Sequence, residues 1–122
     1  MALPLFDTVL SGLTFSSAPV GNTLSLALGA RTLVLFSLTQ SLTFNGIAAL
    51  NGNVDGMFVC LANVTNAAGI IASFAHDGVA AGNSFRLWNA GLATVNGGAG
   101  IGAVSYVYSA SLSHWIMVGK TS

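Results

Sequence analysis

The segment Leu33–Leu38, LVLFSL, decides the fold class because it is apolar on both faces of any strand that it could form. The segment Met57–Leu61, MFVCL, has the same character. An antiparallel strand with one face in water should instead alternate apolar and polar residues. We therefore expect both strands to pack one face on the core and the other on a covering layer, which is either a second sheet or a neighbouring subunit.

Further strands are indicated by period-two alternation. Leu24, Leu26 and Leu28 alternate with Ser25 and Ala27, and the aromatic segment VSYVYS repeats the pattern near the C-terminus. Asn-Gly and Asp-Gly pairs separate the apolar runs and supply the positive φ angles that tight hairpins require. The strands are expected at residues 4–10, 13–17, 24–28, 32–38, 41–45, 57–62, 69–75, 84–89, 102–108 and 113–118.

Ten short strands without a helical segment predict an all-β fold, namely a compact antiparallel β-sandwich or jelly-roll-like domain. The length of 122 residues gives room for one domain, 1–122. Residues 1–20 are either an ordinary first strand or an N-terminal arm that grips a neighbour, and Pro4 disfavours a helix there. The apolar side chains available to such an arm are Leu3, Leu5, Phe6 and Val9.

Charged side chains are scarce. Three cationic and three acidic residues give a net charge of zero, and 53% of the chain is hydrophobic. A compact chain of 12.3 kDa should expose on the order of 6,000 Å² of surface, far more than six charges can keep soluble. We therefore expect an obligate homo-oligomer whose subunits cover much of one another's surface.

Catalytic and cofactor sites are not indicated. The sequence has no H-x-x-H, C-x-x-C or paired-carboxylate spacing, and three Asp residues cannot readily build an acid–base pair with a binding site. The run GGAGIGA matches a dinucleotide-binding pattern but leads into a strand-like segment rather than a helix. We expect no enzyme, cofactor or metal, an exposed turn at His76-Asp77-Gly78 and a buried structural thiol at Cys60.

Nucleic acid and membranes are disfavoured as partners. Three isolated cationic residues cannot supply the phosphate-neutralising stripe that nucleic-acid binding needs. The charge-free stretches are broken every few positions by Ser, Thr, Asn, Gln or Gly, unlike a membrane-spanning helix. The N-terminus, MALPLFDTVL, has no basic region of the kind found in a secretory signal.

The aromatic residues allow two interpretations. Trp88, Tyr106, Tyr108 and Trp115 could form a platform that stacks on sugars, but such residues more often pack in a core or an interface. We favour packing for all four. With Phe36 and Phe58 of the two-faced strands and the four residues of the N-terminal arm, they make up the expected interface.

From about Gly46 to Lys120 the chain resembles a module of tailed-bacteriophage virion proteins, found in fibre tips and in capsid-decorating proteins. The match is an ordered set: VDGMFVCLANVTN, then GIIASFA, then HDGVAAGNSFRLWN, a Gly-rich loop, VSYVYSAS and finally SHWIMVG. In similar sequences the Asn and Arg of the third segment are usually adjacent, whereas Asn83 and Arg86 are separated here by Ser84 and Phe85. The closing Trp often follows an Arg in those sequences, whereas His114 precedes Trp115.

The resemblance implies a trimeric, β-rich, non-enzymatic part of a virion, with 46–120 as the fibre- or decoration-like module. A fibre normally has a shaft, and the sequence shows no heptads or tripeptide repeats that would form one. We therefore expect a capsid cement protein, a homotrimer that bridges subunits of the major capsid protein. It would be made in the host cytoplasm and lie on the outer capsid surface of the virion. The alternative is a tail-fibre or spike tip that binds a host-surface glycan.

Overall fold

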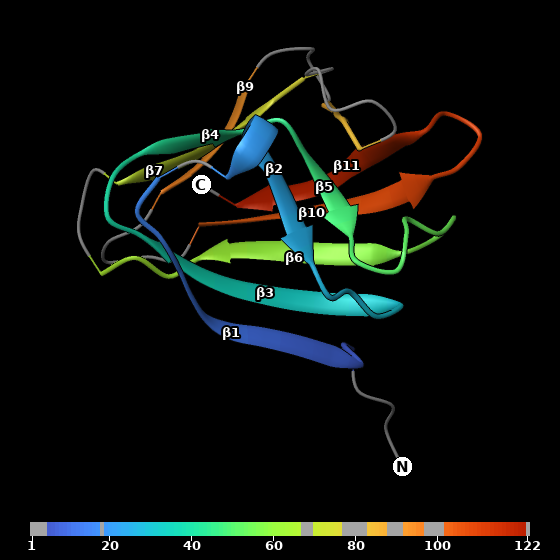
Figure 1. Ribbon diagram of the computed structural model, residues 1–122, viewed down its shortest axis with the longest axis horizontal. Coiled ribbons are helices and arrows are strands. Elements are labelled where there is room, and N and C mark those ends of the chain that lie inside the picture. Colours follow the sequence, from blue (N-terminus) through green and yellow to red (C-terminus); the bar gives the residue numbers. More distant parts are fainter. Residues whose placement is uncertain are drawn as a thin grey trace.

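The structure of the chain is a computed structural model, and it describes residues 5–17, 19–66, 70–76, 83–87, 92–96 and 102–121 (Figure 1). Within these residues the secondary structure consists of β-strands and one short 3₁₀ turn, η1 (Val20–Asn22). The prediction of an all-β fold is confirmed.

The strands form three sheets. The largest has six strands in the order β1-β3-β6-β10-β11-β8. These are β1 (Thr8–Phe15), β3 (Arg31–Leu38), β6 (Phe58–Asn63), β10 (Gly102–Ser109), β11 (His114–Thr121) and β8 (Phe85–Arg86). The second sheet pairs β2 with β5, and the third has the order β4-β7-β9. These are β2 (Thr23–Leu26), β5 (Gly46–Ala49), β4 (Leu42–Phe44), β7 (Ile71–Ala75) and β9 (Leu92–Asn96).

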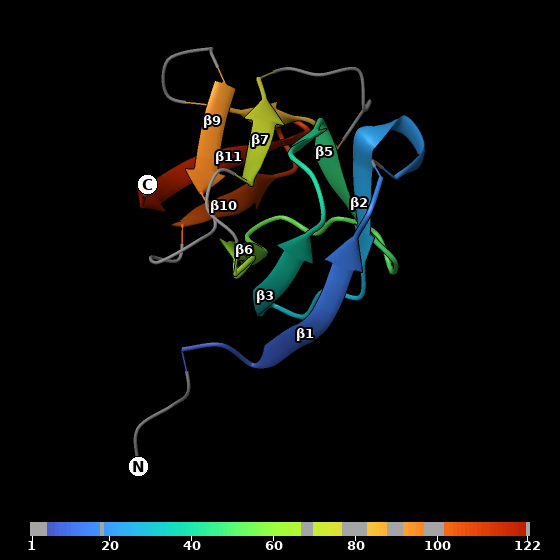
Figure 2. The ribbon, with the colours of Figure 1, turned by 90° about the vertical axis from the view of Figure 1, so that its left-hand side faces the viewer.

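From β1 to β7 the chain forms stacked coils, in which a strand pairs with the strand of the next coil. Strand β1 lies parallel to β3, and β3 lies parallel to β6. In the two smaller sheets β2 pairs with β5 and β4 pairs with β7, again in parallel. Over these strands the chain therefore passes from sheet to sheet and returns one strand further along each, and the sheets surround a common interior (Figure 2).

The expected antiparallel arrangement is wrong for much of the fold. The pairs β6–β10, β10–β11 and β7–β9 are antiparallel, whereas the other pairings between described strands are parallel. Asn45-Gly46 shows the reason, because it does not close a hairpin. The N–H of Asn45 donates to the carbonyl of Asn22 at 2.6 Å, and Gly46 pairs beside Thr23. A turn signal thus serves as a corner between two sheets.

Some strand boundaries also differ from the prediction. The expected strands 4–10 and 13–17 are one strand, β1, with an irregularity between Leu10 and Leu13. Gly12 lies in this irregularity with φ of 74°, a conformation that glycine adopts without strain. Strand β9 was not expected, and β5 follows β4 after a single residue.

An aromatic cluster fills the interior. The rings of Phe85 and Tyr106 have centroids 4.5 Å apart, and Phe74 lies 5.4 Å from Phe85. The indole of Trp115 is fully buried, and its Nε1 donates a hydrogen bond to the carbonyl of Ile47 at 3.0 Å. This bond ties the six-stranded sheet to the sheet of β2 and β5.

The hydroxyl of Tyr106 is an exception in this apolar interior. It is buried and has no hydrogen-bond partner among the described residues. Burial raises the pKa of Tyr106 well above its ordinary value, because the phenolate would lose its hydration. Tyr106 therefore stays protonated over the whole range in which the protein would work.

Candidate interaction surface

The six-stranded sheet has two different faces. Along β3, the residues Val34, Phe36 and Leu38 point into the core and are buried, whereas Leu33 and Leu35 point outward and are partly exposed. Strand β10 and the first four residues of β6 alternate in the same way. The apolar character of LVLFSL on both faces therefore reflects a core on one side and a partly exposed apolar surface on the other.

Strand register brings the outward residues into rows across the sheet. One row runs through Phe58 on β6, Val107 on β10 and Ile116 on β11. Arg31 on β3 and Arg86 on β8 end this row on its two sides. Neighbouring side chains in such rows lie within contact distance, so the row forms a continuous apolar strip between two guanidinium groups.

A second row lies beside the first. Val9 on β1 is placed next to Leu33 on β3, which is next to Cys60 on β6 and then Ser105 on β10. We name the apolar residues of both rows, together with Leu35, the outer face: Val9, Leu33, Leu35, Phe58, Cys60, Val107 and Ile116. Cys60 is partly exposed there, so the expectation of a buried thiol is wrong, since alternation turns its side chain outward.

The N-terminal segment crosses the edge of the outer face. The backbone N–H of Asp7 donates to the carbonyl of Arg31 at 3.0 Å, and the Asp7 carboxylate accepts from the backbone N–H of Arg31 at 3.3 Å. This places the ring of Phe6 6.1 Å from that of Phe58. Gly29 allows the close approach, because a Cβ there would meet the side chains of Asp7 and Thr8.

At the opposite edge of the sheet, where β8 lies beside β11, Arg86 contacts the ring of His114. His114 Nδ1 lies 2.6 Å from the carbonyl oxygen of Leu112, which can only accept, so Nδ1 carries the proton. The remaining ring nitrogen, Nε2, then accepts from Arg86 Nη2 at 3.3 Å. The pair fixes the guanidinium at the end of the apolar strip.

The structure separates the residues of the expected interface. Phe36, Tyr106, Tyr108 and Trp115 lie in the core of the chain, so they cannot contact another molecule, because alternation turns them inward. Phe58 and Val9 lie on the outer face and Leu5 is exposed. Leu3 and Trp88 lie outside the described residues. Burial also excludes Tyr106, Tyr108 and Trp115 from a sugar-stacking platform.

Exposed apolar residues also lie in separate segments away from the sheet face. Leu5, Leu50, Val54 and Leu112 are exposed by 67, 67, 57 and 54%. The loop between β5 and β6 and the loop between β10 and β11 are joined by hydrogen bonds from Gly56 N to the Tyr108 carbonyl at 2.9 Å and from Ala110 N to Asp55 Oδ1 at 2.8 Å. We name these two joined loops, which carry Leu50, Val54 and Leu112, the apolar end; both lie on the right of Figure 1.

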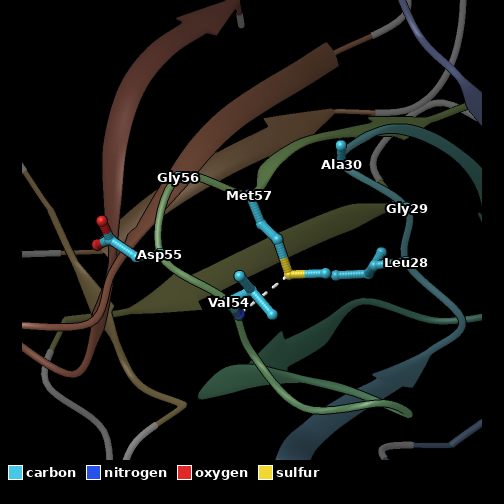
Figure 3. Close-up of a pocket in the computed structure, with 7 residues that line it drawn as sticks. All are labelled: Leu28, Gly29, Ala30, Val54, Asp55, Gly56 and Met57. Carbon is cyan, nitrogen blue, oxygen red and sulfur yellow. Dashed lines mark hydrogen bonds between the residues drawn. The ribbon is translucent and has the colours of Figure 1, made fainter.

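The apolar end contains a shallow hollow of about 390 Å³. Figure 3 shows the side chains of Leu28, Val54 and Met57 pointing toward one another at this hollow. The carboxylate of Asp55 lies on the other side of the same loop (Figure 3). Sequence reasoning missed this surface, because its residues occur singly in turns and only the fold brings them together.

The opposite end of the molecule is polar. The loop after β1 exposes Ser16 and Ser17, and the loop after β3 exposes Thr39, Gln40 and Ser41. Gln40 Nε2 donates to the carbonyl of Ser16 at 2.6 Å, which joins the two loops. The two ends therefore differ in chemistry, and the apolar one continues toward the first row of the outer face through Phe58.

The remaining candidate residues have structural roles. His76 is half-buried rather than part of an exposed turn, and its Nδ1 accepts from the backbone N–H of Leu87 at 2.9 Å. Asp77 and Gly78 lie outside the described residues. Asn63, the acceptor position of the sequon Asn63-Val64-Thr65, is fully buried, and its amide donates to the Ile70 carbonyl at 3.2 Å.

In the part of the chain that the structure describes, no group of three or more His, Cys, Asp or Glu residues could hold a metal ion. The same residues include no helix with the length and hydropathy needed to cross a bilayer. No protein family, curated protein or solved structure matches this chain.

Proposed function

We propose that this chain is a non-enzymatic structural protein of a virion, a capsid cement protein that acts as a homotrimer. The observation that supports the proposal is the outer face, an apolar surface on a sheet whose other face already forms the core. An apolar surface of this kind gains free energy when it is removed from water, by about 25 cal/mol per Å². The resemblance of residues 46–120 to phage decoration modules supports the virion as the place of action.

The mechanism is attachment at many points. A stable contact between subunits buries about 800 Å² on each partner, and the accessible surface of this chain, 6071 Å², is large enough for more than one such contact. A trimer that binds several capsid subunits multiplies modest affinities without new chemistry. Rupture of the shell would then require many contacts to break together. The sandwich or jelly-roll-like form expected of the domain stays a prediction, as does the trimer.

Assembly is tested by light scattering of the purified chain at micromolar concentration. The expected mass is three times 12.3 kDa. A folded monomer at that concentration would contradict the proposal.

The place of action is tested with virions that contain or lack this protein. Those that lack it are expected to release DNA at lower temperature or after milder osmotic shock. Equal release, together with binding of the isolated protein to host cells or their surface polysaccharide, would favour the fibre-tip alternative.

A further inference from the structure

We propose that the free edge of β1 is a two-fold contact site, at which the β1 strands of two copies of this chain pair antiparallel. Strand β1 is the end strand of the six-stranded sheet, and no described strand lies on its other side (Figure 1, Figure 2). The backbone N–H and C=O groups along such an edge are a template for one more strand. The chemistry of the edge therefore calls for an extended chain as its occupant.

The core is incompletely covered at this edge. Leu10, Leu13 and Phe15 of β1 pack against the core but remain partly exposed. Their register partners on β3 are exposed by at most 4%. The added strand must therefore carry apolar side chains on its inward face, where they would cover these three residues.

The pattern of β1 indicates that a second copy of β1 meets this requirement. Exposure along Thr8–Phe15 reads the same from either end, because two exposed residues in the middle separate two mirrored halves. In a regular strand of eight residues, full antiparallel overlap with an identical strand would place inward residues opposite outward ones, since alternation changes face at every residue. The irregularity between Leu10 and Leu13, which contains Gly12 with φ of 74°, removes this mismatch.

Pairing about a two-fold axis between Ser11 and Gly12 brings the inward residues of the two copies together. Leu10 of one copy lies opposite Leu13 of the other, and the sheet continues across the contact with both cores on the same side. A two-fold contact joins a surface to itself, so this apolar pairing occurs twice. Each strand thereby covers the partly exposed core residues of the other.

The outward residues also allow this contact. Val9 of one copy lies opposite Thr14 of the other, and both side chains are exposed in the single chain. The segment Thr8–Phe15 contains no charged residue, so the pairing brings no like charges together. It also lacks the lysine or proline with which edge strands are commonly protected against pairing.

The contact goes beyond the proposed trimer and does not depend on it. A pairing of eight residues is about 27 Å long and one strand wide, so it is smaller than a standard interface between subunits. We therefore expect it to form as the protein concentration rises above the micromolar range. It would double the mass of whichever species is present, trimer or monomer.

The test is sedimentation of the purified protein over a concentration series at low ionic strength. The double variant Val9→Lys/Thr14→Lys places like charges face to face in the proposed register and is expected to weaken the doubling about tenfold or more. Val9→Lys/Thr14→Glu places opposite charges face to face and is expected to restore it. In a parallel pairing each position would face itself, so both variants would weaken the contact.

Val54→Lys/Val118→Lys supplies the matched control. These residues are exposed by 57 and 48% and lie outside β1, so the variant adds the same two charges elsewhere. It is expected to double in mass as the wild type does. If Val9→Lys/Thr14→Lys does not fold, as judged by thermal unfolding, Thr14→Lys alone replaces it.

The outcomes separate this inference from the proposed function. A wild-type protein whose mass never doubles would overturn the edge contact and leave the trimer standing. Equal weakening by Val9→Lys/Thr14→Lys and Val9→Lys/Thr14→Glu would overturn the register, and equal weakening by the control would reduce the effect to net charge; either result overturns the inference. A chain that doubles from monomer to dimer without a trimer would overturn the proposed function and support the edge contact.

Discussion

The two faces of the six-stranded sheet are made from the same strands but differ in burial and in the side chains that they carry. On β10, Val104 points into the core and is fully buried, and Val107, three residues later, lies on the outer face beside Phe58 and Ile116. The inner face belongs to a packed aromatic cluster, and the outer face carries mainly aliphatic side chains with Phe58 and Cys60, between Arg31 and Arg86. The comparison teaches that apolar residues in this chain form the core on one face of the sheet and a partly exposed surface on the other, which is the surface that we propose for association.

The largest expected effect concerns the inner face. Trp115→Ala should lower the free energy of unfolding by about 3–5 kcal/mol, because it leaves a cavity and removes the hydrogen bond to the Ile47 carbonyl. Chemical denaturation measures the change. Trp115→Phe, which keeps most of the ring packing, should lose less. A Trp115→Ala protein with unchanged stability that had lost only glycan or cell binding would instead favour a receptor-binding role.

A matched pair of substitutions compares the faces directly. Val104→Thr should cost about 1–3 kcal/mol of folding stability, because it places a hydroxyl in the core. Val107→Thr makes the same replacement of a methyl group by a hydroxyl on the same strand. It should leave the folding stability of the subunit nearly unchanged and weaken the association of subunits. Thermal unfolding and sedimentation of both variants measure the two effects. Equal losses of folding stability would show that the outer face is not a separate surface.

The smallest expected effect is a gain. Tyr106→Phe should raise the free energy of unfolding by about 1 kcal/mol, because a buried hydroxyl without a partner among the described residues no longer needs to be desolvated.

The raised pKa of Tyr106 has a further consequence at high pH. Since the unfolded chain ionises at the ordinary tyrosine value near pH 10, the wild-type protein loses stability as the pH rises above it. Tyr106→Phe should remove that part of the alkaline loss, and a loss of stability at neutral pH would show that the hydroxyl has a partner.

The sequence predicted the local features well. Alternation in Leu24 to Leu28 and in Val104 to Tyr108 located strands with the correct buried face, because period-two patterning depends only on neighbouring residues. The apolar character of LVLFSL predicted a core on one face and a covering layer on the other; the core face is confirmed, whereas the other face is partly exposed in the chain and its covering layer stays a prediction. The sequence could not predict which strands pair with which. The same Asn-Gly pair can close a hairpin or turn a corner between sheets, and the choice depends on strands elsewhere in the chain.

The residues of the outer face could not be predicted for the same reason, because strand pairing brings them together. Phe58, Val107 and Ile116 become neighbours through two antiparallel registers, and neither register has a local signal in the sequence. Aromatic residues such as Tyr106 and Trp115 were attractive interface candidates, because large rings are common in both cores and contacts. Only their position on the inward side of β10 and β11 decides between the two.

The stacked coils also determine how fast the chain can fold. Among the described strands, β10 and β11 alone are paired neighbours in the sequence, joined by a turn in which Ser113 N donates to the Ala110 carbonyl. Such a hairpin forms in about 1–10 μs, whereas pairings across long stretches of chain place a fold in the range of milliseconds to seconds. Among the described strands β1 comes first in the chain, and β6 and β10 of the same sheet come much later. A chain that is made strand by strand therefore has unpaired strand edges until the later strands follow, and such edges favour aggregation during folding.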